Sequence, residues 1–394
     1  MKSPSFHRLA LAVCFTGLAA NALAVPAFAR RYKVECTFCH QIFPKLNRAG
    51  ERFKERGFRL ENEDKFDQSA WIRSAPVSGR PFGTRNMPED RDARNIGYLK
   101  VLSAGNLGSK VSYWADDAWL RAGGSTTHIK PDNAWARLDI KPNGKLYVKA
   151  GRFELDLPVT QTRTPHLLPY PIYSTSTGLE PDSIGSYQEG LEIGGDLGTT
   201  HLSAAVVKGR NNDAVVDLAR SASVGDPNRF DGNLFLRASR RLAASRFGVF
   251  AYIGRNDLVA RLNATRVGVA KDGILRLGAD ANIRVGNLHA YGVAMYGRNT
   301  DSLLSAAAGG GTGVALDFAG GFLAADYYLR EQLAITARVQ TRSVDLGGVS
   351  PRNTLTSFLP GVQLVVWKLK FSGQMSLSNN GVGRFGAVQV ETAF

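Results

Sequence analysis

The chain has 394 residues, of which 44% are hydrophobic and 21% charged, and its 49 Lys and Arg against 34 Asp and Glu give a formal net charge of +15. The basic residues are spread along the chain and form no block with interleaved aromatic residues, so we expect no nucleic-acid partner. No apolar run is long enough for a transmembrane helix.

The first residues have the pattern of an export signal. Basic residues precede an apolar run from Leu9 to Ala24, and the run ends on small residues, as cleavage before Val25 requires. We therefore predict residues 1–24 to be a signal peptide, whose removal also takes away Cys14. An exported basic protein is expected to meet anionic lipid or acidic partners.

The most specific motif follows soon after the signal, as Cys36-Thr37-Phe38-Cys39-His40. This spacing allows two thiols to bond to the vinyl groups of haem and an imidazole to ligate its iron. We therefore predict one covalent haem c, attached to Cys36 and Cys39, with His40 as the proximal iron ligand. A zinc site would need a fourth ligand, and a redox dithiol suits a cytosolic protein, so export and the adjacent His argue against both.

The segment after the motif, residues 41–60, predicts a short helix. Apolar residues beginning with Phe43 recur at three-to-four spacing, Pro44 suits a first turn and Gly57 suits a C-terminal cap. Phe43, together with Phe38 of the motif, is expected to pack on the haem, although an ordinary amphipathic helix is equally consistent with the spacing. A small α-helical cytochrome domain over residues 25–70 would be too small for a core of its own, so haem would supply most of it.

Residues 71–394 consist of segments that alternate apolar with polar or small residues, separated by turn residues. Counting back from the C-terminus, we predict fifteen strands and add one more, near 73–86, so that the first strand begins on the same side as the last one ends. The predicted strands are 73–86, 96–104, 109–117, 133–141, 145–153, 187–196, 199–208, 230–242, 245–254, 273–285, 287–298, 314–328, 331–342, 354–367, 369–379 and 384–394.

Every second connection between these strands is short, and the others, including 118–132, 154–186, 209–229, 255–272 and 299–313, are long. Outer-membrane barrels have this alternation, with short periplasmic turns and long outer loops. Aromatic residues near the strand ends and the terminal Phe394 favour the same class. We predict a mainly β fold, an antiparallel transmembrane β-barrel of about 16 strands with a polar lumen, in contact with outer-membrane lipid. Periodicity alone leaves a soluble β-domain open.

The N-terminal part resembles a known family, the fused monohaem cytochrome–porin proteins of bacterial outer membranes, whose best-known members are iron oxidases. The resemblance rests on the segment from Val25 to Tyr32, the Cys36–His40 motif, the run Phe43-Pro44-Lys45-Leu46-Asn47, and Gly50, Phe53 and Gly57. Ala49 departs from the aromatic residue expected there. The resemblance implies a haem domain in or against the lumen, which passes electrons from extracellular Fe(II) to a periplasmic electron carrier, an iron:cytochrome c oxidoreductase activity.

The sixth ligand of the iron is less constrained. Met87 falls in the predicted first outer loop and is a candidate, since a Met ligand would raise the haem potential. His166, in the proline-rich loop 154–186, is the next candidate, although that loop could instead fold into the lumen as a constriction. Two other functions stay open: a porin whose haem-bearing segment is a plug, and an exported electron carrier with another donor or acceptor.

Overall fold

The protein is described by a computed structural model that places most of the chain. The described residues are 27–42, 44–60, 77–87, 95–122, 133–159, 164–176, 181–208, 215–217, 222–224, 232–262, 265–303, 314–346, 350–366, 369–379 and 385–391. The predicted signal peptide, Phe43, the predicted domain boundary near residue 70 and the terminal Phe394 lie outside these residues.

Sixteen strands of the described chain form one antiparallel sheet in which each strand pairs with two neighbours. They are β3 (Val77–Met87), β4 (Asn95–Leu107), β5 (Val111–Ala122), β6 (Asn133–Lys141), β7 (Leu146–Glu154), β10 (Tyr187–Leu197), β11 (Thr200–Val207), β14 (Asn233–Leu242), β15 (Ser245–Leu262), β16 (Thr265–Val285), β17 (Leu288–Leu303), β18 (Val314–Arg330), β19 (Leu333–Leu346), β20 (Ser350–Val366), β21 (Leu369–Ser378) and β22 (Phe385–Glu391).

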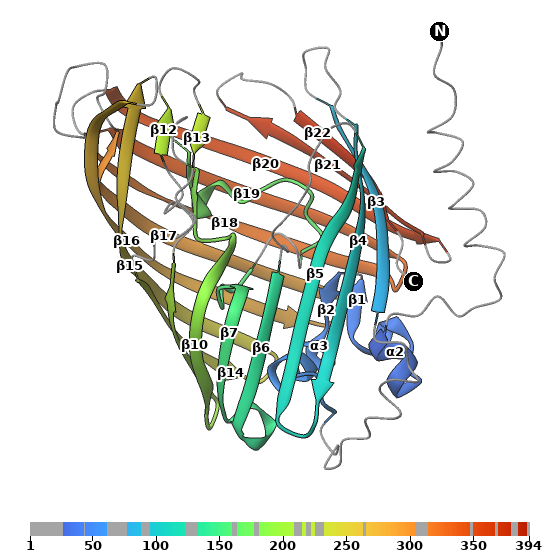
Figure 1. The fold of residues 1–394 in the computed structure, drawn as a ribbon. Helices are drawn as coiled ribbons and strands as arrows, with labels where there is room; N and C mark the ends of the chain where they lie inside the picture. The colour runs from blue at the N-terminus through green and yellow to red at the C-terminus, as the bar shows by residue number, and fades with distance from the viewer. Residues whose placement is uncertain are drawn as a thin grey trace, which may run out of the picture.

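The last strand, β22, pairs with β3, and this pairing closes the sheet into a barrel (Figure 1). Short turns join alternate pairs of strands at one end, for example at residues 142–145, 243–244 and 286–287. The number of strands and the short turns at this end confirm the prediction from sequence. By the rule for such barrels, the end with the short turns is the periplasmic one, and we call it the short-turn mouth.

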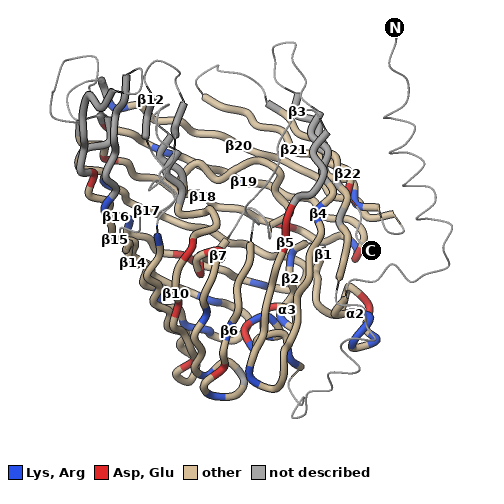
Figure 2. Tube along the Cα trace, in the orientation of Figure 1, with Lys and Arg blue, Asp and Glu red and all other residues tan. Residues whose placement is uncertain are grey.

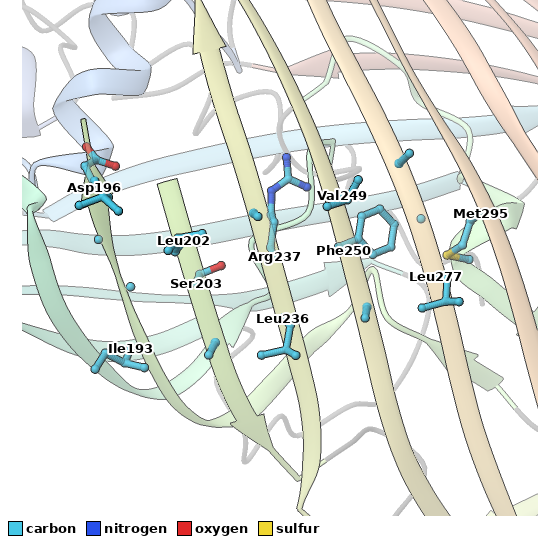
Figure 3. Close-up of a pocket in the computed structure, with 18 of the residues that line it drawn as sticks. Ile193, Asp196, Leu202, Ser203, Leu236, Arg237, Val249, Phe250, Leu277 and Met295 are labelled. Carbon is cyan, nitrogen blue, oxygen red and sulfur yellow. The ribbon is translucent and has the colours of Figure 1, made fainter. Parts of the chain in front are cut away.

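The barrel wall has two faces because successive side chains of a strand point to opposite sides. On β14, Leu236 is exposed on the outer face, whereas its neighbour Arg237 is buried inside (Figure 3). Exposed large apolar residues recur around the outer wall at Leu191, Ile193, Leu202, Val206, Leu236, Val249, Ile253, Leu277, Leu323, Ile335, Val339 and Val362. An apolar outer band of this kind matches a hydrocarbon environment.

The outer wall is also hollowed over β10 to β18. The hollow has a volume of about 1320 Å³, and exposed apolar side chains such as Ile193, Leu202 and Leu277 line it. Because these side chains belong to the outer face, the hollow is part of the apolar surface and not of the lumen. Among the described residues, no helix is long and apolar enough to cross a membrane.

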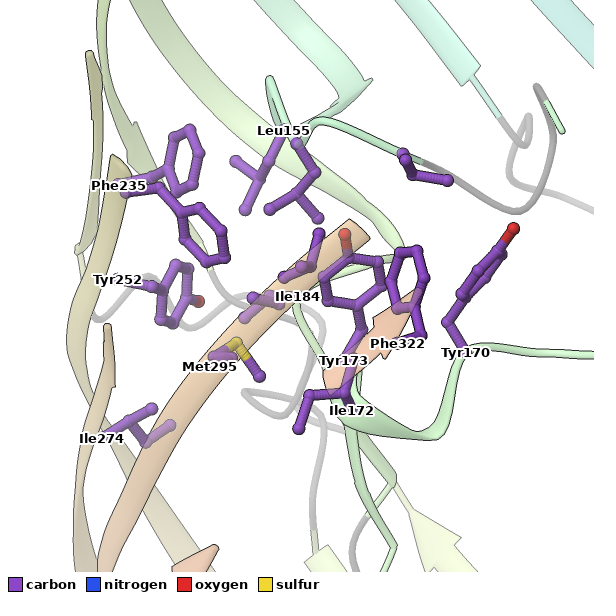
Figure 4. Close-up of a cluster of buried hydrophobic side chains, with 14 of the residues drawn as sticks. Leu155, Tyr170, Ile172, Tyr173, Ile184, Phe235, Tyr252, Ile274, Met295 and Phe322 are labelled. Atoms are coloured by element: carbon purple, nitrogen blue, oxygen red, sulfur yellow. The ribbon is translucent and has the colours of Figure 1, made fainter. Parts of the chain in front are cut away.

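The lumen contains a hydrophobic core, where the sequence predicted a polar channel. The described part of the connection between β7 and β10 folds inward, with a 3-10 turn at Pro171–Tyr173 and a small sheet of β8 (Ser174–Ser176) and β9 (Pro181–Ser183). We call residues 155–159 and 164–176 the inner loop. Its Tyr170, Ile172 and Tyr173 pack against inward-facing residues of the wall, including Phe322 (Figure 4). The inner loop therefore fills the barrel, as the constriction considered for residues 154–186 would do.

A small N-terminal domain, residues 27–60, lies at the short-turn mouth (Figure 1). Its elements are α2 (Ala27–Tyr32), a 3-10 turn η1 (Cys36–Phe38), the strands β1 (His40–Ile42) and β2 (Lys45–Leu46), and α3 (Arg48–Glu55). A short outer hairpin, β12 (Val215–Asp217) and β13 (Ala222–Val224), lies at the opposite end between β11 and β14.

Three features differ from the sequence prediction. The helix expected over 41–60 is restricted to Arg48–Glu55, because Pro44 lies in the turn between β1 and β2 rather than in a first helical turn. Gly57 does cap the helix, with φ +65°, and Phe58 N–H bonds to the Phe53 carbonyl in a Schellman motif.

The other two differences concern the barrel. Residues 255–272 are not a loop but the upper part of a long β15–β16 hairpin, in which Asp257 pairs with Lys271. Met87 is not in a loop either, since it ends β3 and pairs with Gly386 of β22. The strand predicted near 73–86 is present as β3, in which Pro81 lies opposite Leu99 of β4.

Candidate functional site

The Cys36–His40 motif forms a compact loop at the start of the domain. The η1 turn is closed by hydrogen bonds from Phe38 N–H to the Glu35 carbonyl (3.1 Å) and from Cys39 N–H to the Cys36 carbonyl (3.2 Å). Cys36 is exposed and Cys39 is half-buried. Phe38, between the two cysteines, is 44% exposed.

Asn47 holds this loop against α3. Its side-chain oxygen accepts a hydrogen bond from Gly50 N–H (3.0 Å) and so caps the helix. Its side-chain nitrogen donates to the carbonyls of Thr37 (2.9 Å) and Phe38 (3.0 Å). A Cβ on Gly50 would collide with the Cys39 carbonyl oxygen, so only glycine allows the helix to approach the motif this closely. The motif is therefore rigidly positioned by the helix that follows it.

The His40 ring also has a defined orientation. Its Nδ1 lies 3.3 Å from the Pro44 carbonyl oxygen, which makes Nδ1 the protonated nitrogen and Nε2 the basic one. A histidine that ligates a metal commonly donates its other ring N–H to a backbone carbonyl in this way. Among the described residues, no group of three or more His, Cys, Asp or Glu is arranged to hold a metal ion.

An aromatic cluster attaches the domain to the barrel wall. Phe28, Phe53 and Phe58 pack together with ring centroids 4.9–5.9 Å apart. Phe58 continues the cluster onto Trp114 of β5 (5.7 Å) and Trp135 of β6 (5.8 Å). Part of the domain's core is therefore supplied by the wall.

Ion pairs complete the attachment on the other side of α3. Glu51 lies 2.5 Å from Arg284, and Glu55 lies 2.5 Å from Arg241 and 3.5 Å from Arg246. These three arginines come from strand ends beside the short turns at 243–244 and 286–287. We call the set of contacts made by Glu51 and Glu55 the carboxylate seat. It fixes α3 in the mouth of the barrel.

A further ion pair, at the other end of the domain, is fully buried. Lys45 Nζ lies 3.3 Å from Asp326 Oδ2 and 3.6 Å from the centre of the Tyr291 ring. Burial lowers the pKa of Lys45 to about 8, although the nearby Asp326 opposes this shift. His166 of the inner loop contacts the same carboxylate, since its Nε2 lies 3.5 Å from Asp326 Oδ1. Asp326 thus connects the N-terminal domain to the inner loop.

The inner loop is held by polar side chains of the wall. Gln374 bonds to His166 Nδ1 (2.7 Å) and accepts from the backbone N–H groups of Leu167 and Leu168 (2.9 Å each). Arg338 donates to the carbonyls of Leu168 and Pro169. Burial lowers the pKa of His166, so its imidazole is neutral at ordinary pH.

The structure brings some of the sequence-predicted residues together and separates others. Cys36, Phe38, Cys39 and His40 form one loop, as a contiguous motif must. Met87 lies at the far end of β3 from Val77, whose carbonyl accepts a hydrogen bond from Arg30 of the domain. At about 3.3 Å per residue, that places Met87 roughly 33 Å along the strand from this contact.

Sequence reasoning missed the residues that seat the domain. Glu51 and Glu55 are four positions apart on a helix, a spacing that places both on one face, but the sequence does not reveal their partners. Asn47 before a helical pattern was a recognisable capping signal. The buried pair of Lys45 and Asp326 has no local signal, because 281 positions separate its members.

Comparisons with known proteins identify the fold. No protein-family model matches the sequence, and no curated protein matches it. Solved structures do match. The outer-membrane protein OmpT of Vibrio cholerae, in a trimer form, matches with a TM-score of 0.57 and 9% identity, over 81% of this chain and 98% of that one. The outer-membrane channel DcaP of Acinetobacter baumannii matches with a TM-score of 0.55 and 10% identity over 81% of this chain and 96% of that one.

OmpF of Salmonella typhi, in complex with daunomycin, is also similar, with a TM-score of 0.55 and 12% identity over 81% of this chain and 97% of that one. Identities this low show the fold alone. The chain therefore has the fold of bacterial outer-membrane porins.

Proposed function

We propose that this chain is an outer-membrane barrel of porin fold whose short-turn mouth is closed by a haem-bearing domain. The observation that carries the proposal is the position of the Cys36–His40 motif, which belongs to a domain seated in the mouth of a barrel by the carboxylate seat and the Phe58 cluster. A redox motif in this position lies at the mouth of a barrel that spans the membrane, where it is close to the periplasmic compartment.

The local geometry supports a covalent haem at this motif. The two thiols lie on one tight turn, and His40 has the tautomer that presents Nε2 to iron. The exposed Phe38 offers an apolar surface that a macrocycle could cover. Burial, and then the neighbouring Cys36, raise the pKa of the Cys39 thiol, whereas a catalytic dithiol needs a lowered pKa. These features favour haem attachment over disulfide exchange.

Two functions then differ in what the haem does. In the first, suggested by the resemblance to cytochrome–porin fusions, bound haem supplies a one-electron couple between extracellular Fe(II) and a periplasmic electron carrier. In the second, the barrel is a solute channel and the haem domain is its plug. The fold of the solved channel and porin structures favours the second, while the hydrophobic core that the inner loop builds in the lumen opposes free passage of solutes.

Stopped-flow spectroscopy separates the two functions. Purified oxidised protein is mixed with Fe(II) without oxygen, and each Fe(II) oxidised should reduce one haem, at a rate that rises with Fe(II) concentration. Dithionite serves as the positive control for a reducible haem. Reduction by dithionite but not by Fe(II) would rule out iron oxidation and leave the plugged channel, which single-channel currents in planar bilayers would then test directly.

A further inference from the structure

The outward face of α3 is basic because its acidic residues are turned to the wall. Glu51 and Glu55 are both engaged by wall arginines in the carboxylate seat. Arg48 and Arg52, also four positions apart, are exposed on the same helix. Like charges at this spacing repel and cost a few tenths of a kcal/mol. The helix therefore keeps two arginines that repel each other on the side that faces away from the wall.

The same charge continues around the short-turn mouth. Lys110 lies in the β4–β5 turn, Lys141 and Lys145 flank the β6–β7 turn, and Arg330 begins the β18–β19 turn; all four are exposed. In Figure 2 the basic positions of α3 and of the short turns lie at the same end of the barrel.

Exposed carboxylates are sparse at this end. In the part of the chain that the structure describes, only Glu35 and Glu331 are exposed acidic residues of the domain and the short turns. Asp139, which is buried, is already paired with Arg59 and Arg137. Among the described residues, the exposed side chains at this mouth are therefore predominantly basic, and we call the basic ones the basic rim: Lys33, Arg48, Arg52, Lys54, Lys110, Lys141, Lys145 and Arg330.

We propose that the basic rim docks an acidic protein, namely a periplasmic electron carrier with carboxylates around its own redox centre. The assignment of the partner as a carrier rests on the proposed function, because the rim surrounds the domain that holds the Cys36–His40 motif. A predominantly positive surface of this kind raises the association rate of an acidic partner and orients it before contact. Transient redox encounters use small interfaces of less than about 1,200 Å², which suits a rim of charges around a mouth.

The first test measures binding without any redox step. A fluorescein-labelled polyglutamate peptide is titrated with detergent-purified protein and followed by fluorescence anisotropy. The variant R48E/R52E should bind about tenfold more weakly at low salt, and added salt should reduce the difference, because exposed charges are screened. The matched control is R352E, which reverses an exposed charge near the start of β20 at the opposite end and should stay within about twofold of the unchanged protein.

Equal weakening by R48E/R52E and R352E, or no weakening by either, would overturn the proposal. A loss of binding to phosphatidylglycerol vesicles with unchanged polyglutamate binding would also overturn it, since the rim would then contact lipid. Heat-modifiable migration on gels verifies that both variants hold a folded barrel.

The second test addresses the carrier. The haem of dithionite-reduced protein is oxidised by ferricyanide, an anion, or by hexaammineruthenium(III), a cation; in each case one electron leaves haem and reduces the metal complex. R48E/R52E should slow the reaction with ferricyanide and accelerate the reaction with the ruthenium complex, with R352E unchanged. If the protein carries no covalent haem but still binds polyglutamate, the proposed function is refuted, and binding of an acidic partner by the basic rim remains supported. Identical rates for both complexes in R48E/R52E and the unchanged protein would refute the role of the rim in electron delivery.

Discussion

Removal of the carboxylate seat should release α3 from the mouth. In E51Q/E55Q, three ion pairs to Arg284, Arg241 and Arg246 are lost, while size and shape are kept. The side chains in these pairs are 17–41% exposed, so solvent screens each pair to about 0.3–1 kcal/mol. The sum is about 1–3 kcal/mol, which corresponds to a roughly 5- to 150-fold larger population of the released domain.

Hydrogen exchange followed by mass spectrometry measures this population. An eight-residue helix such as α3 is marginal on its own, so its amide protection depends on the seat. Peptides covering residues 45–60 should exchange faster by the same factor, and peptides from the wall strands should be unchanged. The control is E35Q, which removes an exposed carboxylate from the same domain. Exchange in E51Q/E55Q within twofold of the unchanged protein would show that the ion pairs do not hold the domain.

Three further outcomes follow from the same contacts. C36A/C39A should abolish covalent haem staining but leave the heat-modifiable barrel intact, and loss of the barrel as well would contradict separate roles for the two parts. G50A should reduce the yield of haem-loaded protein and lower its melting temperature, because the new Cβ meets the Cys39 carbonyl and overpacking costs about 1–3 kcal/mol. The pKa of Lys45 is about 8 in the seated domain and about 10.4 when the side chain is exposed. The released state therefore binds more protons between these pH values, and seating gains stability as the pH rises through that window. The protection factors of residues 45–60, in which the observed rate is divided into the intrinsic rate at the same pH, should rise over this range, and K45M should remove the slope.

The barrel could be predicted from sequence because its determinants are local. Alternation with a period of two is decided within each strand, and Asn143-Gly144 or Gly286-Asn287 mark short turns wherever the strands lie. The Cys36–His40 motif is likewise contiguous. The β15–β16 hairpin was shortened in the prediction because charged residues such as Arg255 and Asp257 interrupt the alternation where the hairpin continues past the apolar wall.

The interior could not be predicted because it depends on closure of the barrel. Whether Tyr170 of the inner loop meets solvent or Phe322 is decided by the diameter and the register of the whole sheet. The partners of Glu51 and Lys45 lie more than 200 positions away. Inward-facing Arg284 and Asp326 look, in sequence, like any polar residue on the lumen side of a strand.

The buried pair of Lys45 and Asp326 also constrains the order of biogenesis. The domain is made first, but its contacts include β3, through Val77, and β18, through Asp326. Its complete binding site therefore exists only after most of the chain has been translated and exported. Occupation of the mouth therefore follows formation of most of the sheet, whereas formation of the sheet does not require the domain. Cells that fail to mature the first sixty residues would be expected to accumulate barrels that are inserted but open at one end.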